Sequence, residues 1–266
     1  MTQKMDLTAA AGTAWRDFEA CRSTVLQSDV ALVGDINGYQ QEHGGKHLRP
    51  LLVLLSAGAS DNPSPHTARL ATVVELLHSA SLMHDDVVDG DDMRRGVPSV
   101  QRRWNIRVAL LAGDYYLARM MQLLNEVNDT TISQTVVSTA ASMAEGELLR
   151  QQLLLEGQRC DTDTYLRIID HKTARLMQTC CELGANREDK TVAERLRQFG
   201  HAYGMAFQLR DDIDDRNREQ SPWIPDSDTL ERELRTHCTQ ARDALQALAP
   251  SEQRDALIQL TKNLEI

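Results

Sequence analysis

Two aspartate clusters of nearly the same form each follow directly on an apolar helical run. The first covers residues 85–89 (DDVVD) and the second covers residues 211–215 (DDIDD). Residues four apart lie on one face of a helix, so the outer carboxylates of each cluster should point the same way, with the second aspartate flanking them. The candidate metal ligands are Asp85, Asp86, Asp89, Asp211, Asp212 and Asp215.

Carboxylates this crowded repel one another, so a helix end that carries several of them needs solvent or cations to neutralise it. Mg²⁺ prefers oxygen ligands and is commonly held by one or two carboxylates together with substrate phosphates. A single acidic run is usually a solvated face. The second cluster and the nearby basic residues instead favour Mg²⁺ sites that hold a polyphosphate between them.

Basic residues occur in two short segments that suit phosphate. Residues 44–50 (GGKHLRP) combine two glycines with Lys46 and Arg49, and residues 94–98 (RRGVP) begin with an arginine pair. Glycine lets the backbone approach a ligand closely, and lysine and arginine offer charged donors to phosphate oxygens. A Gly-Gly-Lys turn alone is commonly an ordinary solvated loop, so its weight comes from its coexistence with the aspartate clusters.

Periodic apolar residues indicate an all-α fold. In residues 68–84 apolar and small side chains recur at spacings of three and four, and no alternating segment of convincing length suggests a strand. With 266 residues, 41% of them hydrophobic, the chain is long enough for one large core or two smaller ones. Since no linker-like or low-complexity tract divides it, we expect one domain over residues 1–266.

Charge, cysteines and apolar runs limit the partners and the compartment. A net charge of −10 argues against a nucleic-acid partner, which an acidic surface would repel. Five cysteines without metal-ligand spacing suit a reducing cytoplasm. No signal-like segment opens the chain and no apolar run approaches the length of a membrane span. We expect a cytoplasmic enzyme without a transmembrane segment, and leave open a peripheral membrane contact for release of a greasy product.

The ordered motifs of the chain resemble those of the trans-isoprenyl diphosphate synthases, also called polyprenyl synthetases. The resemblance is carried by the segments 44–50 (GGKHLRP), 78–86 (HSASLMHDD), 94–98 (RRGVP), 112–114 (AGD), 172–174 (KTA) and 207–212 (FQLRDD). It implies a bundle of mostly antiparallel helices around a central substrate cavity.

The resemblance also implies a Mg²⁺-dependent prenyltransferase that condenses isopentenyl diphosphate with an allylic diphosphate, releases diphosphate and works as a homodimer. Catalysis would rest on Lys172 and the six aspartates. Carried over position by position, isopentenyl diphosphate would be bound by Lys46, Arg49, His78 and Arg95. The allylic diphosphate would be bound by Arg94, Lys172, Thr173 and Gln208. A lone histidine on an apolar helix face is usually a core residue, but the place of His78 two turns before Asp85 favours the ligand role.

Small side chains at Ala80 and Ser81, four to five residues before the first cluster, predict a long product. In this family a bulky aromatic residue at either place stops chain growth early. With small residues, we expect the tunnel to continue toward residues 73–77 and the trans-polyprenyl product to exceed farnesyl. The alternative is that the small residues only allow close helix packing, while Tyr115 or Tyr116 on another helix supplies the floor.

The chain departs from the family pattern in three places. After Asp215 the usual Gly-Lys loop and a block of one or two helices are missing, which predicts a domain shortened after residue 216. His47 replaces a commonly basic residue, and Arg150 stands where glutamine is common after Gly146-Glu147. Neither of the two replacements, His47 and Arg150, removes a candidate metal ligand.

Two other functions remain open. A shortened C-terminal region suits a non-catalytic or regulatory subunit of a hetero-oligomeric prenyl synthase, yet such a subunit has no physical reason to keep six crowded carboxylates. A terpene cyclase also uses aspartate-rich metal sites. It takes a single diphosphate substrate, so a second diphosphate site at Lys46, Arg49 and Arg95 argues against it.

Overall fold

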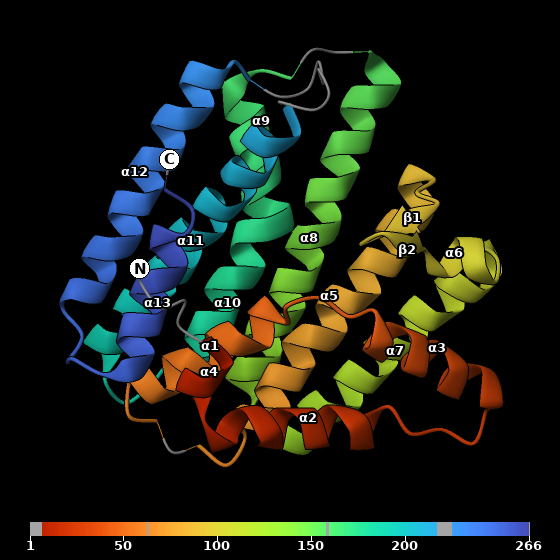
Figure 1. Ribbon diagram of the computed structural model, residues 1–266, viewed down its shortest axis with the longest axis horizontal. Coiled ribbons are helices and arrows are strands. Elements are labelled where there is room, and N and C mark those ends of the chain that lie inside the picture. Colours follow the sequence, from red (N-terminus) through yellow and green to blue (C-terminus); the bar gives the residue numbers. More distant parts are fainter. Residues whose placement is uncertain (1–6, 63, 158–159, 217–224, 266) are drawn as a thin grey trace.

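The computed structural model describes residues 7–265 apart from residues 63, 158–159 and 217–224. Over these residues the fold is almost entirely helical, which confirms the predicted all-α class (Figure 1). The helices are α1 (Leu7–Ala11), α2 (Thr13–Val25), α3 (Ala31–Glu42), α4 (Leu48–Ala59), α5 (Thr67–Asp89), α6 (Val100–Arg103), α7 (Ile106–Val127), α8 (Thr130–Glu156), α9 (Thr162–Ile169), the π-helical turn η1 (Asp170–Ala174), α10 (Arg175–Gly184), α11 (Lys190–Arg216), α12 (Ser227–Gln246) and α13 (Glu252–Lys262).

Helix α5 runs through the bundle and carries the first aspartate cluster in its last turns. It packs against α2, α4, α7 and α10. Its apolar side chains are buried on several faces, from Leu70 (2% exposed) to Met83 (1% exposed), as suits a helix enclosed by others. Even so, none of the described helices, α5 included, is long and apolar enough to cross a membrane.

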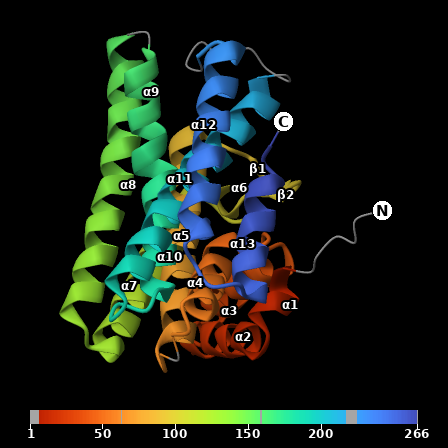
Figure 2. The ribbon, with the colours of Figure 1, turned by 90° about the vertical axis from the view of Figure 1, so that its left-hand side faces the viewer.

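The second aspartate cluster ends α11, which packs against α10 on one side and α12 on the other. Seen from the side, α8 and α9 lie at one edge of the bundle and α12 and α13 at the opposite edge (Figure 2). Helix α10 packs against α8 and α11, and α11 packs against α12. Because α5 also contacts α10, the C-terminal ends of α5 and α11 reach one common cavity.

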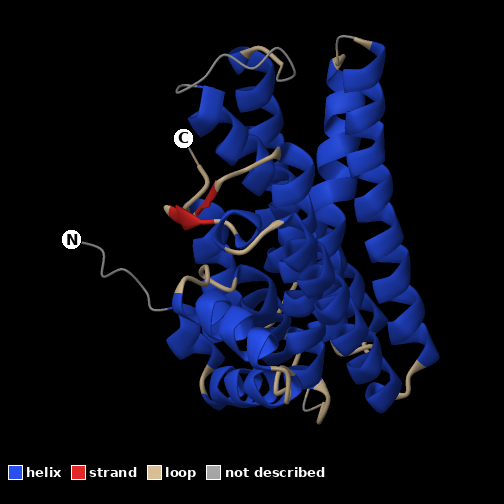
Figure 3. Ribbon diagram, turned by 90° about the vertical axis from the view of Figure 1, so that its right-hand side faces the viewer, coloured by secondary structure: helices blue, strands red, loops and turns tan. Residues whose placement is uncertain are grey.

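A two-stranded hairpin interrupts the helices just after α5 (Figure 3). Strands β1 (Met93–Arg94) and β2 (Val97–Pro98) pair antiparallel. The turn residues Arg95 and Gly96 both have positive φ, 56° and 81°, as in the type I′ turns that suit tight hairpins. The sequence predicted no strand, because strands of two residues are too short to show an alternating pattern.

Side-chain caps define where several helices begin. At six of the described helix starts an oxygen of the N-cap side chain accepts a hydrogen bond from the backbone N–H three residues later, which satisfies a donor that the helix itself leaves unpaired. These caps are Asn105, Asp129, Asp161, Asp189, Asp226 and Ser251.

Candidate active site

One cavity of about 420 Å³ contains residues of both aspartate clusters. It lies between α5, α8, α9, η1 and α11. Three larger cavities among the described residues, of about 560, 650 and 510 Å³, contain neither cluster, so volume alone does not locate the site. The shared cavity is lined by Arg49, His78, Ser81, Leu82, Asp85, Asp89, Met143, Arg150, Leu154, Cys160, Tyr165, Ile168, Ile169, Lys172, Thr173, Gln208 and Asp212.

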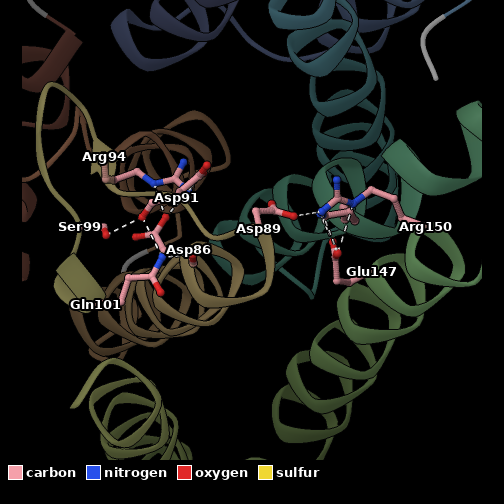
Figure 4. A network of polar contacts seen from close by, with 9 residues as sticks. Asp86, Asp89, Asp91, Arg94, Ser99, Gln101, Glu147 and Arg150 are labelled. Atoms are coloured by element: carbon pink, nitrogen blue, oxygen red, sulfur yellow. Dashed lines mark hydrogen bonds and ion pairs between the residues drawn. The ribbon is translucent and has the colours of Figure 1, made fainter. Parts of the chain in front are cut away.

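The first cluster divides its carboxylates between two environments. Asp85 and Asp89 both line the cavity, as their four-residue spacing predicted. Asp86 points away from the cavity and is 3% exposed, with its Oδ1 accepting a 2.6 Å hydrogen bond from Nε of Arg94 (Figure 4). Gln101 donates to the backbone oxygen of Asp86 at 2.5 Å. The contact between Asp86 and Arg94 thus holds the hairpin against α5.

The second cluster contributes Asp212 to the cavity. Its Oδ2 accepts a 2.5 Å hydrogen bond from the Tyr165 hydroxyl, and its Oδ1 accepts a 3.0 Å bond from Nε2 of Gln208. Thr173 in turn donates to Oε1 of Gln208 at 2.9 Å. Two of the predicted substrate-binding residues therefore orient Asp212 here, and Tyr165 is a member of the site that the sequence did not predict.

The other two candidate ligands of the second cluster, Asp211 and Asp215, are exposed residues and do not line the cavity. Partial shielding of the carboxyl from solvent by its neighbours, together with repulsion by Asp212 and Asp215, raises the pKa of Asp211 to about 6. Burial also raises the pKa of Asp85 and of Asp212. A cation at these carboxylates would relieve that cost.

Lys172 reaches the cavity from η1, a π-helical turn of the kind often found at functional sites. Its ammonium group contacts Glu147 on α8 (Oε2). Gly146 permits this approach, since a Cβ there would lie 2.7 Å from Cβ of His171 and 3.0 Å from Cγ of Lys172. Burial opposes ionisation of Glu147, but hydrogen bonds from Gln151 and Lys172 outweigh it and lower its pKa to about 2.

Arg150, one turn after Glu147 on α8, joins this network to the first cluster. Its guanidinium group contacts Asp89 through Nη2 and donates to Oε1 of Glu147 at 3.0 Å (Figure 4). The sequence marked Arg150 only as a departure from the usual glutamine, and it did not single out Glu147. The pairing joins residues 61 apart in the chain, so no local pattern could reveal it.

Two of the residues predicted to bind isopentenyl diphosphate, Arg49 and His78, line the cavity. Nε of Arg49 is shielded from solvent and has no hydrogen-bond partner among the described residues. Burial, reinforced by the charges of Arg49 and Arg95, holds the pKa of His78 well below its usual range, so the ring is neutral. Both groups are placed to donate hydrogen bonds to an anion in the cavity.

The other two predicted ligands of isopentenyl diphosphate, Lys46 and Arg95, do not line this cavity. Lys46 is exposed, and Arg95 lines the neighbouring cavities together with the hairpin and α3. Gly45 lies directly under the Arg95 guanidinium group, where a Cβ would come within 2.5 Å of its Cζ. This glycine therefore allows the close approach of the two basic segments that the sequence suggested.

Ser81 lines the cavity, and its hydroxyl donates to the backbone oxygen of His78 at 2.9 Å. Ala80 is fully buried (0% exposed) and does not line the cavity. Tyr116 does not line it either. Its hydroxyl donates to Asn37 at 2.9 Å, on the far side of α5. Tyr115 likewise lies outside the lining.

The donor set of the cavity fits a hard divalent cation that is shared with a phosphate ligand. Asp85, Asp89 and Asp212 offer oxygen atoms only, the ligand type that Mg²⁺ and Ca²⁺ prefer. Among the residues that the structure describes, no three acidic, histidine or cysteine side chains already stand close enough to enclose a metal ion. The phosphate of a substrate would complete the coordination.

A helical bundle whose cavity joins two aspartate-bearing helix ends to several cations defines a class of proteins that handle diphosphate esters with divalent metal ions. The polyprenyl synthetase family model matches residues 30–222 of the chain. The chain belongs to this family, and its enzyme class is that of the prenyltransferases.

Individual relatives agree with this assignment. An all-trans-nonaprenyl-diphosphate synthase (geranyl-diphosphate specific) of Rhodobacter capsulatus is 34% identical over 252 residues, which cover 91% of this chain and 75% of that protein. The heptaprenyl diphosphate synthase component 2 of Geobacillus stearothermophilus is 36% identical over 192 residues, but the chain covers only 59% of its length. The crystal structure of a polyprenyl synthase from Caulobacter crescentus, complexed with calcium and isoprenyl diphosphate, has a TM-score of 0.86 at 25% identity and covers 97% of this chain and 96% of that one.

Proposed function

We propose that the protein condenses isopentenyl diphosphate with an allylic diphosphate and makes a trans-polyprenyl diphosphate longer than farnesyl, with Mg²⁺ as its metal. The observation that carries the proposal is the single cavity that holds Asp85, Asp89 and Asp212 together with Lys172, Arg150 and the unpaired nitrogen of Arg49. Relatives named as nonaprenyl, octaprenyl and heptaprenyl synthases support a long product.

The residues that line the cavity would have different roles in the reaction. The carboxylates of Asp85, Asp89 and Asp212 would hold Mg²⁺, which neutralises diphosphate oxygens and makes diphosphate a better leaving group. Lys172 supplies a further positive charge beside the leaving group. The apolar wall of Leu82, Ile168 and Ile169 keeps water from the allylic cation until the double bond of isopentenyl diphosphate attacks it and a proton is lost. Arg49 and His78 would hold the second diphosphate.

Direct assay tests the proposal. The protein is incubated with isopentenyl diphosphate, one allylic primer at a time and Mg²⁺, and the products are separated by length. We expect Asp85→Ala to abolish turnover with the fold retained, because a metal ligand is lost. Asp92→Ala, which removes an exposed acid of the hairpin segment, should leave turnover unchanged. An Asp85→Ala variant with normal turnover would exclude the metal-site assignment.

A homodimer is part of the proposal. Ile106, Leu110 and Met121 are 55%, 41% and 58% exposed and fall on one face of α7, and Val137 on α8 is 55% exposed. Exposed apolar faces of this kind mark protein contacts. Sedimentation of the purified chain tests for a dimer, and Met121→Glu should shift it toward the monomer.

A role as one subunit of a two-component synthase is the second candidate, since two relatives are named component 2 of a heptaprenyl diphosphate synthase. Turnover by the purified chain alone would decide for the self-sufficient enzyme. A cytoplasmic location and a peripheral membrane contact for product release remain part of the first proposal. The prediction that the domain is shortened after residue 216 also remains part of the first proposal. Residues 217–224 lie outside the described part of the chain.

A further inference from the structure

Arg150 occupies the place between the first aspartate cluster and the Lys172 side of the cavity. Its side chain is 32% exposed, as is that of Asp89, with which it forms an ion pair. Its Nε and Nη2 donate to Oε1 of Glu147 at 3.2 and 3.0 Å. These contacts outweigh the effect of burial and raise the pKa of Arg150.

Asp89 can form its ion pair with Arg150 only while its carboxylate is free of metal. Lys172 and Arg150 are two cations, and Glu147 and Asp89 are the two anions that contact them. Glu147 is already shared between Lys172, Arg150 and Gln151. If a divalent cation takes the carboxylate of Asp89, Arg150 loses one partner and faces a like charge at short range.

A guanidinium group displaced in this way has one obvious new partner. Arg150 lines the cavity, so a diphosphate held there by metal lies within its reach. Arginine binds phosphate oxygens through paired N–H groups, which makes such a contact strong. Glutamine, common at this position in the family, carries no charge. It would neither oppose the metal nor attract the diphosphate to the same degree.

We propose that Arg150 controls the binding of metal at Asp89. In the metal-free protein Arg150 pairs with Asp89 and competes with metal for its carboxylate. Once metal holds Asp89, Arg150 binds the diphosphate. This inference rests on the proposed function. With arginine at position 150, metal and diphosphate would bind more cooperatively than with glutamine. The protein would then favour metal that arrives together with diphosphate over metal alone.

Metal binding without substrate tests the first half of the inference. Mn²⁺, which can be followed by its paramagnetic resonance, is titrated into the wild type, Arg150→Gln and the control Arg187→Gln. Arg187 forms a 2.7 Å ion pair with Asp129 away from the cavity. We expect Arg150→Gln to bind Mn²⁺ on the order of fivefold more tightly, as loss of a competing ion pair would give. Arg187→Gln should match the wild type. Equal affinities in all three proteins would overturn the inference.

Binding of inorganic diphosphate at saturating Mg²⁺, measured by calorimetry, tests the second half. Loss of a charge-assisted contact should weaken binding to Arg150→Gln by about tenfold or more. Arg150→Lys should recover part of that affinity, because it keeps the charge but not the fork. Unchanged diphosphate affinity in Arg150→Gln would overturn the role of Arg150 as a ligand. Neither titration needs turnover. A protein that elongates no primer would contradict the proposed function, whereas the two titrations alone would support or overturn the role of Arg150.

Discussion

Arg49 combines a positive charge, burial and an unpaired donor, a state that a protein keeps only at a cost. A buried donor without a partner costs about 1–3 kcal/mol. Burial also lowers the pKa of Arg49. An anionic ligand that accepts from Nε would remove this cost, so the unpaired donor favours binding of isopentenyl diphosphate.

We expect Arg49→Met to leave the free energy of unfolding unchanged or to raise it, while the Michaelis constant for isopentenyl diphosphate rises by about tenfold or more. Urea unfolding and steady-state kinetics measure the two effects. The Michaelis constant for the allylic primer is the internal control. If both constants rose equally, Arg49 would not distinguish the two substrates. Lys46→Met should raise the first constant less, since Lys46 is exposed and lines none of the cavities described above.

Asp211 gives the metal-free protein a pH-dependent stability of defined sign. Its pKa in the folded protein is about 6, against 3.8 for the free side chain. Between these values the Asp211 carboxyl binds more protons in the folded state than in the unfolded state, so its contribution to stability falls as the pH rises from about 4 to about 6 and then levels off. Asp211→Asn should flatten this slope in urea unfolding across that range.

The control for this measurement is Asp129→Asn. Hydrogen bonds from Arg187 and from the backbone lower the pKa of Asp129. Its ionisation therefore changes the stability mainly at pH values below 4. Its removal should leave the slope between pH 4 and 6 as in the wild type. An Asp211→Asn variant whose slope between pH 4 and 6 equalled that of the wild type would contradict the assignment of Asp211.

At the scale of elements, the cavity depends on how α9 and η1 are held against α11. Tyr165 on α9 donates to Asp212, and Thr173 in η1 reaches the same carboxylate through Gln208. Gly204 on α11 lets η1 come close, since a Cβ there would lie 2.6 Å from Cα of Ala174. Two elements therefore orient one candidate metal ligand.

Tyr165→Phe removes one of these supports without changing the apolar contacts of the ring. The hydrogen bond from Tyr165 lowers the pKa of Asp212 against the effect of burial, so its loss leaves a less well-oriented and more easily protonated ligand. We expect the Mg²⁺ concentration for half-maximal rate to rise about fivefold. Tyr115→Phe, which loses only a 3.5 Å contact outside the cavity, is the control. An unchanged Mg²⁺ requirement in Tyr165→Phe would show that Asp212 needs no such support.

The sequence predicted the helices and the shared face of Asp85 and Asp89, because both follow from the period of the α-helix. It did not predict the hairpin, nor that Asp86 would be enclosed by Arg94, because two-residue strands leave no pattern. The sequence did not predict Tyr165 as a site residue for a different reason. Its partner Asp212 lies 47 residues further on, and only the packing of α9 on α11 brings them together.

At the scale of the whole molecule, product length depends on how far the cavity can extend between the helices. Beyond Ser81 the residues 73–77 of α5 are almost fully buried, with Leu77 3% and Val73 0% exposed. The predicted route for the growing chain is therefore filled by side chains. A product longer than farnesyl has to displace them, and the small side chain at Ala80 leaves them room to move.

The two small residues before the first cluster should respond differently to enlargement. Ser81 lines the cavity, so Ser81→Phe should place a ring across it and shorten the product while the fold and activity persist. Ala80 is 0% exposed, so Ala80→Phe should shorten the product but also lower the free energy of unfolding by about 1–3 kcal/mol through overpacking. Chromatography of the products and urea unfolding measure both effects, with Ser81→Ala as the control for loss of the hydroxyl. A wild type that stops at farnesyl, or a Ser81→Phe variant with an unchanged length distribution, would show that the chain leaves the cavity by another route.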